Sequence, residues 1–556
     1  MKTVQNRKGF HLRRLFHAVM MTAFFILLYS ASWPVDSFSQ NLFVELDPFF
    51  SFVTIVAVRL ISAWLLVSLI TLAAAMVFGR LFCGHVCPMG IFLDFADWLG
   101  LGRIRKLTAK RMGELSCRGG PSCRVDPSAS EVRPRPPRTF GAGTWIKYII
   151  LGSSIIAAVL GLSLVYSFDP LSIFTRFSSL VLYPSSVFIT NTFLSILKPL
   201  AEKTGLAVLA HAHFRQASFS ADIATLVIIC AVVAINLVSY RGWCRYLCPA
   251  GAMLGIFSMN PSWRRCVSDK CNDCGICAGK CHMGCIPDDF RKTKHSECIT
   301  CQACVRSCPQ DAIIFEFRKR SEAVQSADMK TRRIIIGSIL GGGAAAGLIK
   351  TDLFFPPGMG PMAPDGSSRL IRPPGALPEN DFNAACTRCG ICMRACVTNT
   401  IQPSWFEAGA GGLWTPRLVP RHAACEKECA LCGQVCPTGA LRPLSLDEKN
   451  NAKLGTAFII HEQCISWSTE KTCLICQEQC PNGAIVLKNE KGLANQVPYV
   501  TENKCSGCGQ CENACPVIGN SAVVVGSSGE IRLTHGSYLK KAKELGLELE
   551  AKKAEG

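Results

Sequence analysis

Four long apolar runs, separated by polar and mostly basic segments, dominate the first 240 residues of the chain. Each is roughly 19–23 residues long, and they cover 15–33, 60–79, 145–167 and 221–239. A helix rises about 1.5 Å per residue, so each run is long enough to cross the hydrocarbon core of a bilayer. The pattern therefore predicts four transmembrane helices. A further apolar segment, 177–197, contains Pro184 and many polar residues, which favours an interfacial or re-entrant helix.

The charges between these runs predict an orientation. Five Lys and Arg residues lie in 1–14 and eleven in 80–144, whereas 34–56 has none and 168–220 has four. Positive residues favour the cytoplasmic side, so the N-terminus, 80–144 and the chain just after residue 239 are expected there. The net charge of +19 then needs no nucleic-acid partner, because the basic residues lie between apolar runs. A hydrophobic content of 49% and a mean hydropathy of +0.26 also indicate a membrane protein.

The second and fourth runs end in related motifs, "GRLFCGHVCPMG" and "RGWCRYLCPAG". The related stretches "LDPFFSF" and "FDPLSIF" precede the second run and follow the third. A unit with an outer Asp-Pro and an inner Cys-x3-Cys-Pro is thus used twice. Four thiols should face one another at the cytoplasmic edge, namely Cys83, Cys87, Cys244 and Cys248. They predict a metal, iron–sulfur or redox dithiol site, with small residues at two helix ends as the structural alternative.

Three charged residues are candidates for a quinone and proton site. Asp47 and Asp169 each precede a proline, which is typical of helix N-caps with proline in the first turn. The alternative for both is a proton acceptor linked to quinone. Arg59, at the outer mouth of the second run, is either a quinone ligand or an interfacial arginine.

Twenty-four of the 33 cysteines fall into six ferredoxin-like motifs. A [4Fe–4S] cluster takes three thiolates from a Cys-x2-Cys-x2-Cys loop and often a fourth from the partner motif. By this rule the first two motifs form two clusters, with ligands Cys271, Cys274, Cys277 and Cys308, and Cys298, Cys301, Cys304 and Cys281. Zinc ribbons also use Cys-x2-Cys, but four cysteines at this spacing favour clusters.

Four more motifs follow residue 380, two regular and two with a longer first gap, and they predict four further clusters. Their cysteines are Cys386, Cys389, Cys392, Cys396, Cys425, Cys429, Cys432, Cys436, Cys464, Cys473, Cys476, Cys480, Cys505, Cys508, Cys511 and Cys515. We expect the first of these motifs to pair with the fourth and the second with the third. Of the remaining cysteines, Cys117 and Cys123 form a possible dithiol, while Cys266 and Cys285 are interpreted as structural. No haem is expected, because Cys-x2-Cys-His is absent and the apolar runs contain only His17.

The two Cys-x3-Cys-Pro motifs, the four spans and the following two-cluster ferredoxin resemble the NapH/MauN-type membrane ferredoxins. The stretches "RLIRPPGALPENDFNAACTRCGICMRAC" and "CALCGQVCPTGAL" are similar to the NapG/MauM-type polyferredoxins. The chain thus looks like a fusion of both. The resemblance implies a quinol dehydrogenase-type component that passes electrons from the quinone pool to a periplasmic multihaem cytochrome or reductase. An electron-donating maturation or reactivation factor for a periplasmic metalloenzyme is the alternative.

The stretch "KTRRIIIGSILGGGAAAGLIK", residues 330–350, lies between the two groups of ferredoxin motifs. Arg332 and Arg333 before a mildly apolar run predict a twin-arginine signal, which exports folded domains. We expect an uncleaved fifth span that uses the twin-arginine machinery and leaves the C-terminal domain in the periplasm. The alternative is that the arginines are only a positive flank and the domain stays inside.

Together these features predict a multidomain protein of the bacterial inner membrane. Its fold class is an α-helical membrane domain of four spans plus a linking fifth span, with α+β ferredoxin-like domains. The predicted parts are a membrane domain (1–260), a cytoplasmic two-cluster ferredoxin (261–320), the signal or fifth span (328–352), a periplasmic four-cluster polyferredoxin (370–535) and a polar tail (536–556).

Overall fold

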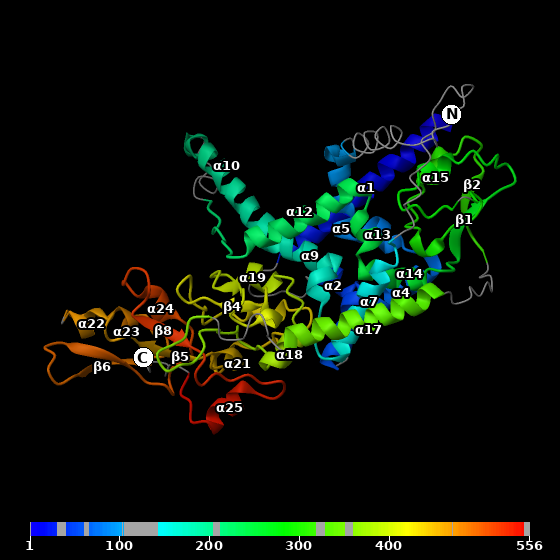
Figure 1. The fold of residues 1–556 in the computed structure, drawn as a ribbon. Coiled ribbons are helices and arrows are strands. Elements are labelled where there is room, and N and C mark those ends of the chain that lie inside the picture. Colours follow the sequence, from blue (N-terminus) through cyan, green and yellow to red (C-terminus); the bar gives the residue numbers. More distant parts are fainter. Residues whose placement is uncertain are drawn as a thin grey trace, which may run out of the picture.

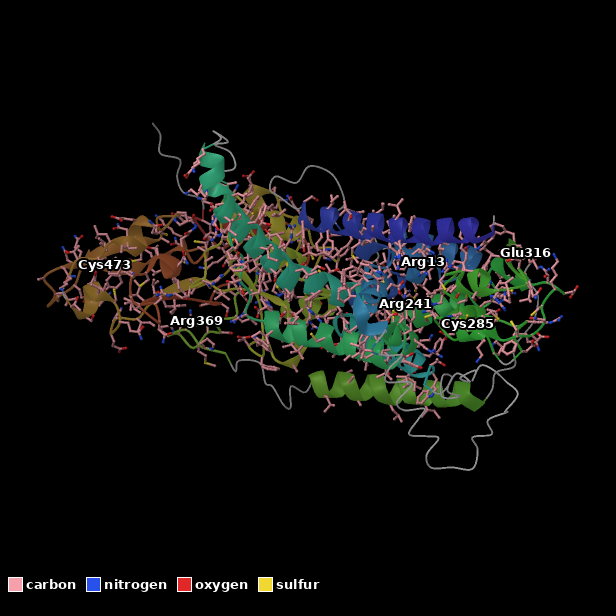
Figure 2. All side chains as sticks on the ribbon, turned by 90° about the horizontal axis from the view of Figure 1, so that it is seen from above. Arg13, Arg241, Cys285, Glu316, Arg369 and Cys473 are labelled. Carbon is pink, nitrogen blue, oxygen red and sulfur yellow. The ribbon has the colours of Figure 1, made fainter. Side chains whose placement is uncertain are left out.

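The computed structural model describes residues 2–30, 41–59, 66–102, 104, 143–203, 212–287, 289–318, 329–350, 360–469 and 471–549. It has three parts along one long axis. Figures 1 and 2 both show a helical domain (2–257) in the middle, with the small ferredoxin domain (263–317) at one end and the polyferredoxin (360–549) at the other. The N-terminus lies at the end that carries the small ferredoxin domain.

The first half of the helical domain contains short helices that begin inside the domain. Its elements are α1 (Lys2–Tyr29), α2 (Leu42–Glu45), α3 (Pro48–Val58), α4 (Ser68–Phe78), the π-helical turn η2 (Phe82–Val86), α5 (Pro88–Ala96) and the π-helical turn η3 (Asp97–Leu101). Asp47 caps α3, because its carboxylate accepts hydrogen bonds from Phe49 N (2.8 Å) and Phe50 N (3.3 Å). Proline starts both α3 and α5, where its missing N–H costs nothing and its fixed φ suits a helix.

The second half repeats this arrangement. Its elements are α7 (Ile146–Val159), α8 (Val165–Phe168), α9 (Pro170–Phe177), the π-helical turn η5 (Ser178–Leu182), α10 (Tyr183–Lys203), α12 (Asp222–Val238), α13 (Gly242–Tyr246) and α14 (Pro249–Phe257). Asp169 caps α9 by accepting from Ser172 N at 2.6 Å, and Cys248 Sγ accepts from Gly251 N at 3.2 Å. The internal repeat is therefore a pair of Asp-capped helices and a pair of Cys-Pro helices. All four are packed around one apolar core.

The helical domain does not reproduce the predicted four continuous spans. Among the described residues, one helix, Pro170–Pro199, is long and apolar enough to cross a membrane. Shorter apolar helices are Pro48–Val58, Ser68–Phe78, Ile146–Val159, Asp222–Val238 and Ile336–Leu348. The segment 177–197 lies within the long helix Pro170–Pro199, and its interfacial or re-entrant placement stays a prediction.

The glycine-rich run after the paired arginines is a packing surface. It forms α17 (Met329–Lys350), which lies along α7 and leads toward the polyferredoxin (Figure 1). A Cβ added to Gly341 would lie 2.8 Å from Ser153 Oγ, and one added to Gly152 would lie 2.3 Å from Ser338 Oγ. Glycine thus allows the two helix backbones to approach closely, as in membrane helix pairs.

The small ferredoxin domain is built on one antiparallel pair of strands. Strand β1 (Trp263–Val267) pairs with β2 (Ile313–Phe317), and the register places Trp263 opposite Phe317. Between the strands lie α15 (Ile276–Gly279), η6 (His295–Glu297) and α16 (Ala303–Ser307). Helices α15 and α16 contain the third cysteine of each motif.

The polyferredoxin contains three antiparallel strand pairs: β3 (Ile401–Pro403) with β4 (Pro416–Leu418), β5 (Thr456–Ile459) with β8 (Val523–Gly526), and β6 (Ile485–Asn489) with β7 (Gln496–Val500). Four short helices contain the third cysteine of each motif: α19 (Ile391–Ala395), α20 (Leu431–Gln434), α23 (Ile475–Glu478) and α24 (Gln510–Ala514). The other helices are α18 (Glu379–Ala385), η7 (Ala410–Gly412), α21 (Leu446–Asn450), α22 (Ile465–Ser468) and α25 (Tyr538–Glu544). Helix α25 lies in the predicted tail but packs on α21 with Tyr538 fully buried, so it belongs to this domain.

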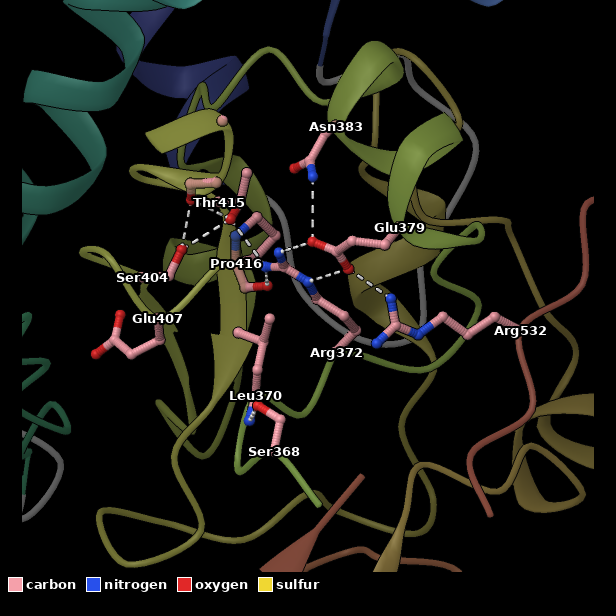
Figure 3. A network of polar contacts seen from close by, with 12 residues as sticks. Ser368, Leu370, Arg372, Glu379, Asn383, Ser404, Glu407, Thr415, Pro416 and Arg532 are labelled. Carbon is pink, nitrogen blue, oxygen red and sulfur yellow. Dashed lines mark hydrogen bonds and ion pairs between the residues drawn. The ribbon is translucent and has the colours of Figure 1, made fainter. Parts of the chain in front are cut away.

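A polar network holds the start of the polyferredoxin together (Figure 3). The Arg372 guanidinium binds Glu379 at 2.5 and 3.2 Å, Thr415 Oγ1 at 2.8 Å and Pro416 O at 2.9 Å, and Arg532 binds the same carboxylate at 2.6 Å. Burial alone would raise the pKa of Glu379, but the two guanidiniums hold it at about 2. The network joins α18 to β4 and to the C-terminal segment.

Candidate metal centres

The cysteines of the polyferredoxin gather into four centres, each with three cysteines of one motif and one of its neighbour. Centre 1 is Cys386, Cys389, Cys392 and Cys436; centre 2 is Cys425, Cys429, Cys432 and Cys396; centre 3 is Cys505, Cys508, Cys511 and Cys480; centre 4 is Cys464, Cys473, Cys476 and Cys515. The first motif thus pairs with the second and the third with the fourth. The expected pairing of outer with outer and inner with inner was wrong, because α19 packs on α20 and α23 packs on α24.

The donor set of these centres fits iron–sulfur clusters. Burial raises the pKa of Cys425 and Cys476 to about 12, so the bare thiols stay protonated at neutral pH. Bound iron supplies the positive charge that makes such buried thiols bind as thiolates.

The four centres follow one another away from the helical domain. Centre 1 lies against it, because a Cβ added to Gly390 would be 3.4 Å from Ser179 Cβ and 3.7 Å from Arg176 Cα. Centre 2 adjoins centre 3, since Cys425 N donates to Cys508 O at 2.9 Å. Cys473 of centre 4 lies near the far tip of the molecule (Figure 2).

The small ferredoxin domain brings its cysteines together largely as predicted. Cys298, Cys301 and Cys304 line one pocket with Cys281, which we call centre B. In centre A, Cys271, Cys274 and Cys277 lie near one another, and Cys308 packs on the same core as Cys277.

Centre B contains a fifth thiol that the sequence analysis interpreted as structural. Cys285 lines the same pocket, and its Sγ lies 3.3 Å from Cys281 Sγ. A sequence signal for it existed. In four of the six motifs proline directly follows the fourth cysteine, whereas here His282 follows Cys281 and the nearest proline, Pro287, lies two residues after Cys285.

The four cysteines of the repeated Cys-x3-Cys-Pro motifs also meet at one place, which we call the four-cysteine site. Cys83, Cys87, Cys244 and Cys248 all interact electrostatically with one another, and the last three are buried. The small ferredoxin domain packs directly on this site, because a Cβ added to Gly84 would lie 2.3 Å from Ile299 O. Ile299 follows the first ligand of centre B, so the two sites are neighbours.

The structure explains the arginine and glycine of the repeated motif. Arg241 binds Asp94 through two bonds of 2.8 Å and donates to Cys83 O at 2.6 Å. It passes over Gly90, where an added Cβ would lie 3.3 Å from its Nη1. In the other direction Arg80 crosses over Gly251, where an added Cβ would lie 2.5 Å from its Nη2.

In each repeat, therefore, a fully buried arginine side chain packs on the Cys-Pro helix of the other repeat. Arg80 also pairs with Glu297 of the small ferredoxin domain at 3.1 Å, and Lys147 holds the same carboxylate at 2.6 Å. The sequence analysis noted these arginines only as part of a pattern. Their identical spacing, three residues before the first cysteine, was the signal that they belong to the site.

Asp47 and Asp169 act as N-caps, and in addition their carboxyl groups lie close enough to interact with one another. Both are fully buried. Asp47 also lies within electrostatic range of Cys87, and the outer position of Asp-Pro and inner position of Cys-Pro stay predictions. Both motifs start helices inside the domain.

The structure does not bring Arg59 to this aspartate pair. Arg59 is the exposed C-cap of α3, in a left-handed conformation with φ of 59°, and α3 separates it from Asp47 by about 18 Å. The predicted dithiol Cys117 and Cys123 lies outside the described residues.

Two family models match parts of the chain that contain these cysteines. A model described as a 4Fe-4S binding domain matches residues 60–106 and 221–265, the segments that contain the four-cysteine site. A model described as a 4Fe-4S dicluster domain matches 471–518, which contains most ligands of centres 3 and 4. No solved structure matches the chain.

Curated relatives match over about a third of the chain. The methylamine utilization ferredoxin-type protein MauM of Methylophilus methylotrophus is 37% identical over 167 residues, which is 29% of this chain and 72% of that protein. MauM of Paracoccus denitrificans is 34% identical over 37% of this chain and 88% of its own length. The chain belongs to the MauM family of ferredoxin-type proteins. The ferredoxin-type protein NapG of Escherichia coli K12 is also similar, 34% identical over 26% of this chain and 65% of NapG.

As a MauM-family protein, the chain is an iron–sulfur electron-transfer protein with 4Fe-4S binding domains. A cluster supplies one-electron chemistry when it is bound. The residues of this chain hold it, exclude water from it and set the charge around it.

Proposed function

We propose that this protein takes electrons from quinol and passes them through [4Fe–4S] clusters to a periplasmic multihaem cytochrome or reductase. The observation that carries this proposal is the order of the cysteine sites along the molecule. Centre B adjoins the four-cysteine site at one end of the helical domain, and centres 1 to 4 lead away from the other end. In this proposal six centres hold clusters, and the four-cysteine site holds a further iron–sulfur or redox centre.

Oxidation of a quinol releases two electrons and two protons, so the site needs proton acceptors. Asp47 and Asp169 are suited to this, because they lie between the four-cysteine site and centre 1. Helix α9 runs from Asp169 to Arg176 beside centre 1. Asp47 Oδ2 and Asp169 Oδ1 accept no hydrogen bond from the residues that the structure describes. One of these oxygens would take the first proton of the quinol.

We further propose that the helical domain is a NapH/MauN-type partner fused to the polyferredoxin and lies in the bacterial inner membrane. The opposite positions of the two ferredoxin parts support a cytoplasmic small domain and a periplasmic polyferredoxin. Export would use Arg332 and Arg333 and the twin-arginine machinery. The close packing of α17 on α7 supports a span that is retained after export.

The decisive experiment is quinol-driven reduction of the purified full chain in detergent, followed by electron paramagnetic resonance. Duroquinol should reduce clusters in the wild type, and Cys83→Ser combined with Cys244→Ser should block reduction of centres 1 to 4. The electron-transfer proposal fails if dithionite reduces every cluster but no quinol reduces any. The topology is tested by proteolysis of spheroplasts. The polyferredoxin should be cut in the wild type and protected when Arg332 and Arg333 are both Lys.

A maturation factor is a second candidate, because two of the relatives, covered to 72% and 88% of their length, are named for methylamine utilization. The amount of protein distinguishes the two functions. Respiration falls in proportion to the protein if it is an electron conduit, and survives at low amounts if the protein acts only during assembly.

A further inference from the structure

Two buried arginines lie at the contact between the helical domain and centre 1. Arg176 belongs to α9, and Arg388 lies between the ligands Cys386 and Cys389. Only 1% of Arg176 and 3% of Arg388 is exposed. Figure 1 shows α9 beside α19, which contains Cys392 of centre 1.

Aromatic rings from both domains cover the two guanidiniums. Arg176 Cζ lies 4.4 Å from the centre of the Trp414 ring, and Arg388 Cζ lies 3.5 Å from that of Tyr166. Arg388 also donates to Gly411 O. Nε and Nη1 of both arginines lack a hydrogen-bond partner in the described parts of the chain. Each domain thus supplies one arginine and one ring to a shared, buried contact.

The charged and titratable groups that act on this pair do not neutralise it. Arg176 interacts with Arg388, Tyr166 and the ligand Cys389. Arg388 interacts with Tyr166, the ligand Cys386 and the cation Arg372. No carboxylate acts on either guanidinium in these sets, whereas Arg372 itself is paired with Glu379.

Buried charges without a partner are strongly unfavourable, and aromatic faces offset only part of that cost. The negative charge that is missing here is the one that a cluster bound by four thiolates brings. Centre 1 has the required ligands directly beside both arginines. Centre 2 has one buried cation, Lys449, beside Cys425, and centre 3 has Lys453 beside Cys505, which also interacts with Glu502.

We propose that Arg176 and Arg388 are the counter-charges of the cluster in centre 1 and raise its reduction potential above those of centres 2 to 4. Net charge and environment set the potential of a cluster, and two buried guanidiniums favour the reduced, more negative form. Reduction adds one electron from the donor in the helical domain and forms or breaks no bond. Because Arg176 comes from the helical domain, centre 1 reaches this potential only when the two domains are in contact. The proposal rests on the proposed function for the source of the electron.

The test is an equilibrium redox titration of the full chain in detergent, followed by electron paramagnetic resonance and total iron. Arg176→Gln and Arg388→Gln should each lower the midpoint potential of one cluster by at least about 59 mV. For a one-electron couple this is a tenfold change in the reduction equilibrium. The other clusters and the iron content should not change. Arg176→Lys keeps the charge and should restore most of the potential. Arg417→Gln is the matched control, because Arg417 is largely buried in the same domain but pairs with Glu407 at 2.9 Å.

Unchanged midpoints in both glutamine variants, with iron intact, overturn the proposal. It is also overturned if Arg176→Lys retains its iron but shifts the midpoint as much as Arg176→Gln, since packing on Trp414 would then be the cause. If the shifts occur as expected but quinol reduces no cluster, the proposed function fails and this inference stands.

Discussion

Replacing Asp94 by Asn tests the ion pair that joins the two repeats of the helical domain. Both oxygens of Asp94 bind Arg241 at 2.8 Å, and Tyr240 OH and Arg13 bind the same carboxylate at 2.6 and 3.2 Å. Only 1% of the Arg241 side chain is exposed. Asn keeps the shape but leaves the guanidinium buried without its anion, which costs about 3–5 kcal/mol of unfolding free energy.

The assay is thermal unfolding of the full chain in detergent by far-UV circular dichroism, with total iron measured in parallel. Asp94→Asn should lower the transition temperature of the helical domain. It should also loosen the four-cysteine site, because Arg241 donates to Cys83 O. Combining Asp94→Asn with Arg241→Gln removes the buried charge, so the double variant should be more stable than Asp94→Asn alone. Asp222→Asn, at an exposed helix start, is the control.

Two results would refute this reasoning. One is a cost below about 1 kcal/mol for Asp94→Asn, the range of exposed ion pairs. The other is a double variant no more stable than the single one, because the cost would then not come from an uncompensated charge.

Three further predictions concern other parts of the chain. Glu379→Gln should destabilise the polyferredoxin by about 1–2 kcal/mol at neutral pH, after allowing for screening of the partly exposed carboxylate. Because its folded pKa of about 2 lies below the usual 4.5, thermal scans should show this difference vanishing as the pH falls from 4.5 to 2. Cys281→Ala should keep the iron of centre B, since Cys285 can take the place of Cys281 as a ligand. Iron analysis should show the loss of one cluster when both cysteines are replaced by alanine. Loss of that iron in the single variant would contradict the prediction. Gly341→Leu should cost about 1–3 kcal/mol in a thermal scan by separating α17 from α7, while Gly347→Leu, with open space at its Cβ, should not.

The ligand triplets and helix starts could be predicted from the sequence because they are local. Three cysteines spaced as in Cys386, Cys389 and Cys392 lie within one short loop and helix, so they reach the same centre whatever surrounds them. Asp47 and Asp169 cap helices because each carboxylate binds N–H groups two or three residues ahead. The repeat of Asp-Pro and Cys-Pro could be recognised for the same reason.

The partners of these local elements were decided by tertiary structure. The fourth ligand of each centre, the fifth thiol Cys285 and the contact of Asp47 with Asp169 all depend on which helices pack together. Arg241 meets Asp94 across 147 residues of sequence. Neighbours along the chain are set by covalent geometry, whereas many packings of the same short helices satisfy one hydrophobic pattern. Only side-chain shape and charge in the assembled fold choose among them.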